Sequence, residues 1–185
     1  MRKTSGRYTC LIAAVVMAFA PGVRAQSATE SQMKAAFLYS FAKFVEWPAD
    51  SYAERNTPIT IGIMGKDPFG RDLEDIVRGR SAAGRPVVVR RYSVKEVPQS
   101  QILFVSASER KRIAELLDPL KHAPVLTVSD ISDFAERGGM IEFIAEDGHI
   151  RLEINMNGAQ AAGLKISSKL LGAATLVHEQ RREPR

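Results

Sequence analysis

Two glycines give the first pattern in this sequence that could serve chemistry. Gly65 and Gly70 are separated by four residues, as in a phosphate-binding loop, and lie between a β-rich run and an expected helix. The next residues are Arg71-Asp72 rather than Lys followed by Ser or Thr, and Asp67 would repel a phosphate at the helix start. We therefore interpret the two glycines as a turn and a close backbone approach, not as a nucleotide site.

Catalytic and metal-binding patterns are equally weak. Ser108-x-x-Lys111 has the spacing of the serine acylases of the penicillin-binding class, but no Lys-Thr-Gly follows and the chain is too short for that fold. No Gly-x-Ser-x-Gly elbow presents a nucleophile. His122, His149 and His178 are far apart, which gives no zinc spacing. We predict a protein that is not an enzyme and has no catalytic residue, metal or cofactor.

The N-terminus has the three parts of a secretory signal peptide. Three basic residues lie within 1–7, an apolar run covers 8–20, and Pro21-Gly22 breaks that run before Ala25. The run of 13 residues is too short for a membrane-spanning helix, which needs about 20. We predict cleavage after Ala25, export to the periplasm, and a single mature domain over 26–185.

Cleavage changes the charge of the protein. The chain has 26 Lys and Arg and 21 Asp and Glu; four of the basic residues and none of the acids lie within 1–25, which leaves 22 basic against 21 acidic groups. A nearly neutral mature chain gives no reason to expect nucleic acid as a partner. The only cysteine, Cys10, is removed as well, so no disulfide is expected.

The apolar pattern alternates between strands and helices. A capping box, Thr29-x-x-Gln32, begins the first helix, which ends before Trp47-Pro48. The later helices are expected at 67–80, 106–120, 133–136 and 168–178, and the strands at 59–65, 86–92, 102–105, 125–128, 140–145 and 149–155. This pattern predicts an α/β fold, in which a mixed β-sheet is flanked by α-helices and ends in a C-terminal antiparallel hairpin.

Aromatic residues in the first helix fall on one face. Phe37, Phe41 and Phe44 are spaced as a helical stripe, which is more often part of a core than a ligand box. We expect the stripe to dock the helix on the sheet.

Residues of the hairpin are the candidates for contact with another protein. In its second strand, apolar residues alternate with polar ones, so one face is buried and the other, with Glu153 and Asn155, is polar. Met140 and Ile141 follow the Gly138-Gly139 break at the hairpin entrance. We predict these four residues as a partner-binding surface, and the alternative is an ordinary solvated face and a sheet edge.

Several segments together resemble one family of periplasmic proteins. In chain order they are KAAFLYSFAKF at 34–44 with Trp47-Pro48, IGIMG at 61–65 with DPFG at 67–70, ILFVS at 102–106, VLTVSD at 125–130, GGMI at 138–141, and RLEIN at 151–155 ahead of SSKLL at 167–171. Their order and spacing resemble the YfiR family, also called DUF4154, over nearly all of the mature chain.

The resemblance implies a regulator of cyclic-di-GMP signalling and biofilm formation. A YfiR-like protein would hold an inner-membrane diguanylate cyclase inactive through the periplasmic sensor domain of the cyclase, and an outer-membrane lipoprotein would relieve this by sequestration. A sensor kinase is an alternative membrane partner, and a homodimer is also compatible. Redox control through disulfides does not carry over, because the mature chain lacks cysteine.

A second function remains open on the residues alone. A periplasmic small-solute sensor module that feeds a membrane receptor or histidine kinase would use a cleft, either at the strand ends near Gly65 or between the first helix and the sheet. A pocket with a few polar groups would favour this reading, whereas an exposed apolar patch would favour the regulator.

Overall fold

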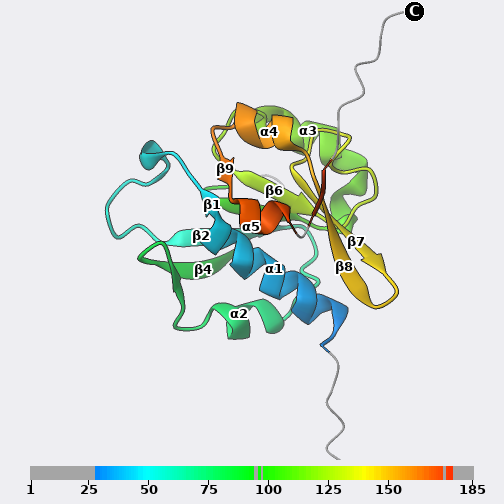
Figure 1. Cartoon of the computed structure of the whole chain (residues 1–185), viewed down its shortest axis with the longest axis horizontal. Coiled ribbons are helices and arrows are strands. Elements are labelled where there is room, and N and C mark those ends of the chain that lie inside the picture. The colour runs from blue at the N-terminus through cyan, green and yellow to red at the C-terminus, as the bar shows by residue number, and fades with distance from the viewer. Residues whose placement is uncertain (1–27, 94–95, 97, 173, 177–185) are drawn as a thin grey trace, which may run out of the picture.

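The computed structural model describes residues 28–93, 96, 98–172 and 174–176. The predicted signal peptide at 1–25 and His178 lie outside these residues. Helices and strands alternate along the described chain and are followed by an antiparallel hairpin, so the predicted α/β class is confirmed. Figure 1 traces this order from blue to red.

A mixed sheet forms the centre of the fold. Its strands lie in the order β10 (Ala174–Leu176), β8 (His149–Ile154), β7 (Ile141–Glu146), β6 (Leu126–Ser129), β5 (Ile102–Val105), β2 (Ile59–Met64), β4 (Arg85–Tyr92) and β3 (Ser81–Ala82). The five strands from β7 to β4 pair in parallel, and β8 pairs with β7 antiparallel. Every residue of β2 and β5 is buried, as expected for parallel strands covered on both faces.

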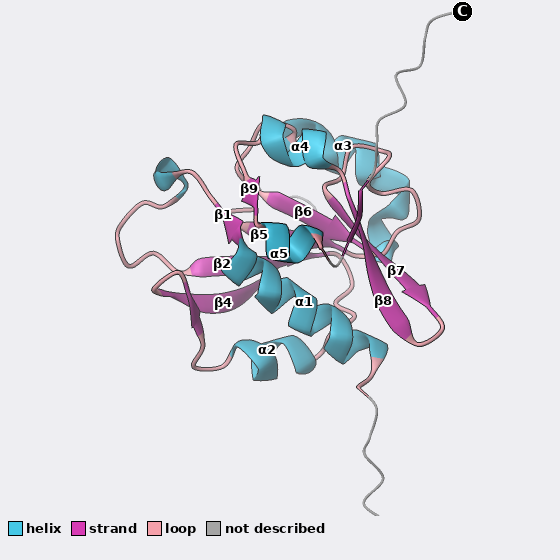
Figure 2. Cartoon of the chain, in the orientation of Figure 1, coloured by secondary structure: helices cyan, strands magenta, loops and turns pink. Residues whose placement is uncertain are grey.

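Short helices cover the sheet, as the cyan ribbons of Figure 2 show. The α-helices are α1 (Glu30–Phe44), α2 (Asp72–Val77), α3 (Ile113–Leu117), α4 (Met156–Ala161) and α5 (Ser168–Leu171), and the 3-10 helices are η1 (Ala49–Ser51), η2 (Ala107–Arg112) and η3 (Asp118–Leu120). The single helix predicted over 106–120 is thus a run of η2, α3 and η3. A separate antiparallel pair, β1 (Val45–Glu46) and β9 (Lys165–Ile166), connects the end of α1 to the segment before α5.

The first helix is docked by its aromatic residues, as its spacing predicts. The capping box forms, with the Thr29 hydroxyl accepting a hydrogen bond from the Gln32 amide. Phe41 is fully buried, and its ring centroid lies 6.3 Å from that of Phe37 and 5.9 Å from that of Phe143 on β7. Phe37 and Phe44 are half-buried against the same core. The stripe therefore holds α1 against the sheet.

Two predicted helices are shorter or missing because local hydrogen bonds favour turns. The helix expected over 67–80 spans only Asp72–Val77, since the Asp67 carboxylate accepts a hydrogen bond from the Phe69 amide at 2.7 Å and closes a turn. The helix expected over 133–136 is a turn in which Asp133 has a φ of 64°, a left-handed conformation that a helix cannot contain.

The last predicted helix is wrong beyond Leu171. Where a helix was expected to continue, Ala174–Leu176 forms β10, which pairs in parallel with β8. The free edge of β8 offers unpaired backbone groups to this segment, and tertiary pairing overrides local helical spacing. The structure also adds a helix that the spacing did not predict, α4, which begins directly after the hairpin.

Candidate functional site

The four residues predicted at the hairpin have different environments. Met140 and Ile141 are 2% and 0% exposed and belong to the core. Their side chains hold the start of β7 in the sheet and present no surface for a partner in this structure. Glu153 and Asn155 are partly exposed, so of the four residues these two can contact solvent or another molecule.

Glu153 is part of a cluster of carboxylates on the hairpin and the loop that precedes it. The β7–β8 ladder places Glu153 directly opposite Glu142. Asp133 and Glu136 are both exposed, and their negative charges also act on the Glu153 carboxylate. We call these four residues, Asp133, Glu136, Glu142 and Glu153, the acidic face. Like charges directly opposite each other in a ladder destabilise a sheet by roughly 0.2–1 kcal/mol.

Sequence reasoning found one member of this face and missed the other three, although a signal was available for Glu142. The turn between the strands consists of Asp147 and Gly148, with φ of 51° and 75°, which is the two-residue type I′ turn. A two-residue turn sets the register, and counting back from it places Glu142 opposite Glu153. Asp133 and Glu136 reach the face only through the fold of the loop after β6.

Burial and the neighbouring negative charges shift the pKa of Glu153 in the same direction. The pKa of Glu153 is raised, first by burial and then by the charges of Glu142, Glu136 and Asp133. Arg151 opposes this shift, but its guanidinium is paired with Glu146 at 3.0 Å. Glu142 is buried, and its carboxylate accepts a hydrogen bond from the Ala135 amide at 3.3 Å. The acidic face is thus a concentration of negative charge, exposed at Asp133 and Glu136 and partly exposed at Glu153, that a cationic group would stabilise.

Asn155 positions the segments around this face. Its side-chain oxygen accepts a hydrogen bond from the Gly158 amide at 2.9 Å and so caps α4. Its side-chain amide donates to the Ala135 carbonyl at 3.1 Å, and its backbone amide donates to the Met140 carbonyl at 2.9 Å. One side chain therefore connects the end of β8, the start of α4 and the loop that carries Asp133 and Glu136.

A cleft lies beside Asn155. Its volume is about 250 Å³, and it is lined by Leu117, Leu120, Lys121, His122, Thr127, Gly138, Met140, Asn155, Asn157, Gly158 and Ala161. The cleft thus brings together two residues predicted from the sequence, Met140 and Asn155. It lies between the end of α3 and α4, not near Gly65 or under the first helix, where the sensor reading expects it.

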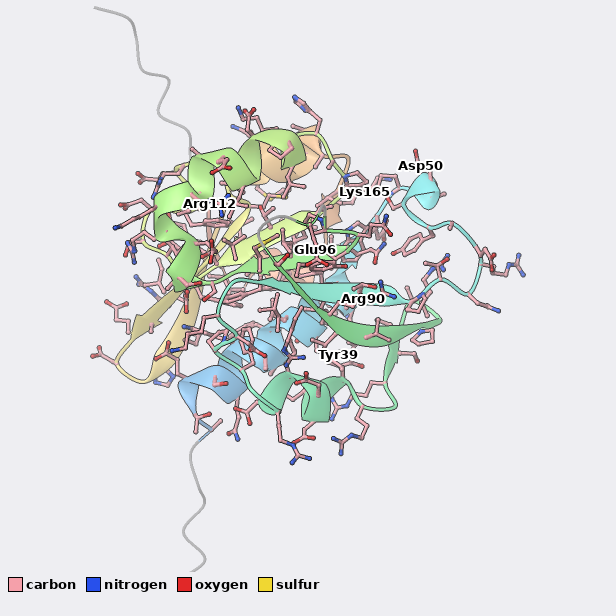
Figure 3. All side chains as sticks on the ribbon, turned by 180° about the vertical axis from the view of Figure 1, so that it is seen from behind. Tyr39, Asp50, Arg90, Glu96, Arg112 and Lys165 are labelled. Carbon is pink, nitrogen blue, oxygen red and sulfur yellow. The ribbon has the colours of Figure 1, made fainter. Side chains whose placement is uncertain are left out.

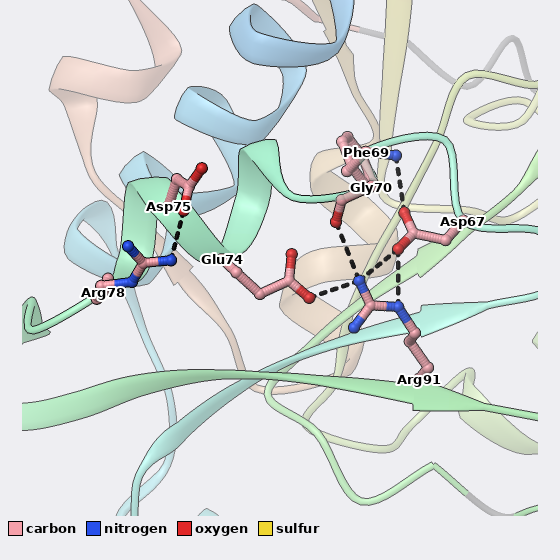
Figure 4. Close-up of polar contacts among 7 residues, drawn as sticks. All are labelled: Asp67, Phe69, Gly70, Glu74, Asp75, Arg78 and Arg91. Atoms are coloured by element: carbon pink, nitrogen blue, oxygen red, sulfur yellow. Dashed lines mark hydrogen bonds and ion pairs between the residues drawn. The ribbon is translucent and has the colours of Figure 1, made fainter.

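The strand ends near Gly65 are occupied by the chain itself. A Cβ atom on Gly65 would lie 2.4 Å from the Ser108 hydroxyl, and Gly65 has a φ of 88°. This confirms the interpretation of a turn with a close approach. Figure 4 shows how Asp67 is used: it pairs with Arg91 of β4, which also contacts the Gly70 carbonyl and Glu74 of α2. These contacts close the region that a phosphate would need.

Among the residues that the structure describes, no group of three His, Cys, Asp or Glu side chains could hold a metal ion. Within the same residues, no helix has the length and the apolar character needed to cross a membrane.

Comparison with protein families gives a match over most of the chain. The sequence model of a family described as YfiR/HmsC-like matches residues 31–175, which include all of α1 except its first residue, the whole hairpin and the residues that line the cleft. Comparison with curated proteins gives no significant match.

Proposed function

This chain belongs to the YfiR/HmsC-like family, and we propose from this that it is a periplasmic regulatory protein that acts by contact with an inner-membrane signalling protein. The contact is with the periplasmic domain of that protein and keeps it inactive. A diguanylate cyclase is the partner that the family favours, in which case the regulator controls the production of cyclic-di-GMP. A sensor kinase is the alternative.

The observation that carries this proposal is the acidic face. Glu153 is partly exposed and surrounded by like charges, and this arrangement works against the stability of the hairpin. A partner that presents Lys or Arg side chains would relieve the repulsion and gain charge-assisted hydrogen bonds. We therefore infer that the membrane partner presents a basic patch to the hairpin. The buried residues Met140 and Ile141 then act by supporting the hairpin and not by direct contact.

Titration calorimetry tests this contact. The mature chain, 26–185, is titrated with the purified periplasmic domain of the membrane protein encoded beside it. We expect Glu153→Lys to weaken binding at least tenfold, because reversing the charge replaces attraction by repulsion at the acidic face; tenfold corresponds to about 1.4 kcal/mol. If the partner is a cyclase, cells that carry this variant should contain more cyclic-di-GMP.

The matched control is Asp50→Lys, which makes the same change of charge at an exposed position in η1. In Figure 3, Asp50 lies on the opposite side of the view from the β7–β8 hairpin. Binding by this control should equal that of the unmodified chain. Equal binding by Glu153→Lys and the unmodified chain would remove the acidic face from the contact, and equal losses in both variants would show a nonspecific effect of net charge.

A further inference from the structure

The cleft between α3 and α4 has the chemistry of a binding site for a small organic anion. Among the residues that line it, Leu117, Leu120 and Met140 are apolar and almost fully buried, and we call these three its floor. Leu120 and Met140 are 8% and 2% exposed, so the floor is a fixed part of the core and not a mobile surface. Such a floor favours the apolar body of a ligand.

The polar atoms deep in the cleft are already satisfied. The Thr127 hydroxyl accepts a hydrogen bond from the Met140 amide at 3.1 Å. The Asn155 side chain uses its oxygen for the Gly158 amide and its nitrogen for the Ala135 carbonyl. Because these groups have partners within the protein, an apolar ligand at the floor leaves none of them unpaired.

Residues at the rim of the cleft are the ones that can recognise the charge of a ligand. Lys121 and His122 lie there, and no Asp or Glu is among the residues that line the cleft. The Lys121 ammonium pairs with Asp118 at 2.8 Å, but both side chains are mostly exposed, 61% and 74%, so this ion pair contributes little and can be exchanged. A carboxylate placed at the rim would gain a charge-assisted hydrogen bond from Lys121.

We propose that this cleft binds a small carboxylate with an apolar body. The volume of about 250 Å³ lies just below the range of about 300–1,000 Å³ that is typical of pockets for drug-sized ligands, and so it suits a small acid. The proposal does not depend on which membrane protein is the partner. Asn155 lines the cleft and also holds the loop that carries Asp133 and Glu136, so a ligand in the cleft would lie against a residue that positions part of the acidic face.

Titration of the ¹⁵N-labelled mature chain with 4-methylpentanoate, followed by amide chemical shifts, tests the proposal. The amides of Gly138, Met140 and Gly158 should shift together and reach saturation. The neutral analogue 4-methylpentanamide should bind about tenfold more weakly, the loss expected when one charge-assisted hydrogen bond is missing. Absence of saturable shifts up to the solubility limit of the acid, or equal binding of acid and amide, would overturn the proposal.

Three variants locate the site. Lys121→Gln should weaken binding of the acid about tenfold, whereas Lys111→Gln, the same change at an exposed position of η2 outside the cleft, should leave it unchanged. Ala161→Leu places a larger side chain in the cleft from an exposed helix position and should abolish binding without lowering the melting temperature. Equal losses in the two lysine variants, or unchanged binding by Ala161→Leu, would place the shifts outside the cleft and refute the assignment.

Discussion

Replacement of Glu153 by glutamine should stabilise the protein while weakening its proposed contact. The substitution keeps the size of the side chain and removes one of two carboxylates that lie directly opposite each other in the β7–β8 ladder. The cost of such a like-charge pair is roughly 0.2–1 kcal/mol, so Glu153→Gln should raise the free energy of unfolding at pH 7 by that amount. For a domain of this size, the melting temperature should rise by about 0.4–4 °C.

The pH dependence provides an independent check of the same reasoning. The pKa of Glu153 is raised in the folded protein, by burial first and by the neighbouring carboxylates next, so the folded state binds a proton more readily than the unfolded state. Stability is therefore lost as the pH rises from 4.5, the ordinary pKa of a glutamate, through the raised pKa of the folded state. The gain from Glu153→Gln should be present at pH 7 and small below pH 4.5.

Thermal and chemical denaturation of matched variants at the two pH values measures these effects. The control is Glu146→Gln on the same hairpin, which removes the ion pair with Arg151 and should leave stability unchanged or lower it by a few tenths of a kcal/mol. If Glu153→Gln lowers the free energy of unfolding at pH 7, or if Glu146→Gln raises it equally, the carboxylates of the acidic face do not repel one another as argued.

Three further outcomes follow from the fold and the sequence. Phe41→Ala should cost about 3–5 kcal/mol of stability in denaturant unfolding, because the ring is fully buried between Phe37 and Phe143; an unchanged midpoint would contradict that burial. Asn155→Ala should cost about 0.5–2 kcal/mol through loss of the α4 cap, and an unchanged free energy of unfolding in the same assay would contradict that role. Mass spectrometry of the periplasmic fraction should show a mature chain that begins at Gln26, and an intact chain from Met1 in the cytoplasm would refute export.

Local patterns were sufficient where one short-range rule decides the structure. The capping box at Thr29 forms, the apolar runs at Ile59 and Ile102 are strands, and the hairpin follows from alternation and an Asp-Gly turn. These local predictions hold because no long-range contact in the fold favours a different structure at the same residues. The family was also readable from the sequence, since the matching segments keep their order and spacing along the chain.

Long-range contacts decided the features that the local patterns predicted wrongly. The segment at Ala174–Leu176 forms a strand because the edge of β8 is free to pair with it, which no local pattern reveals. Met140 and Ile141 were predicted at a partner surface from their position after two glycines, yet the sheet buries them.

The sequence by itself therefore determined the class of fold, the presence of the hairpin and the family, because helix caps, turn residues and apolar spacing act between near neighbours. Only the tertiary structure brought Asp133 and Glu136 to the side of Glu153 and enclosed a cleft between α3 and α4. Charge repulsion and cavity shape depend on distances between segments far apart in the chain. Those distances are set by packing of the whole domain.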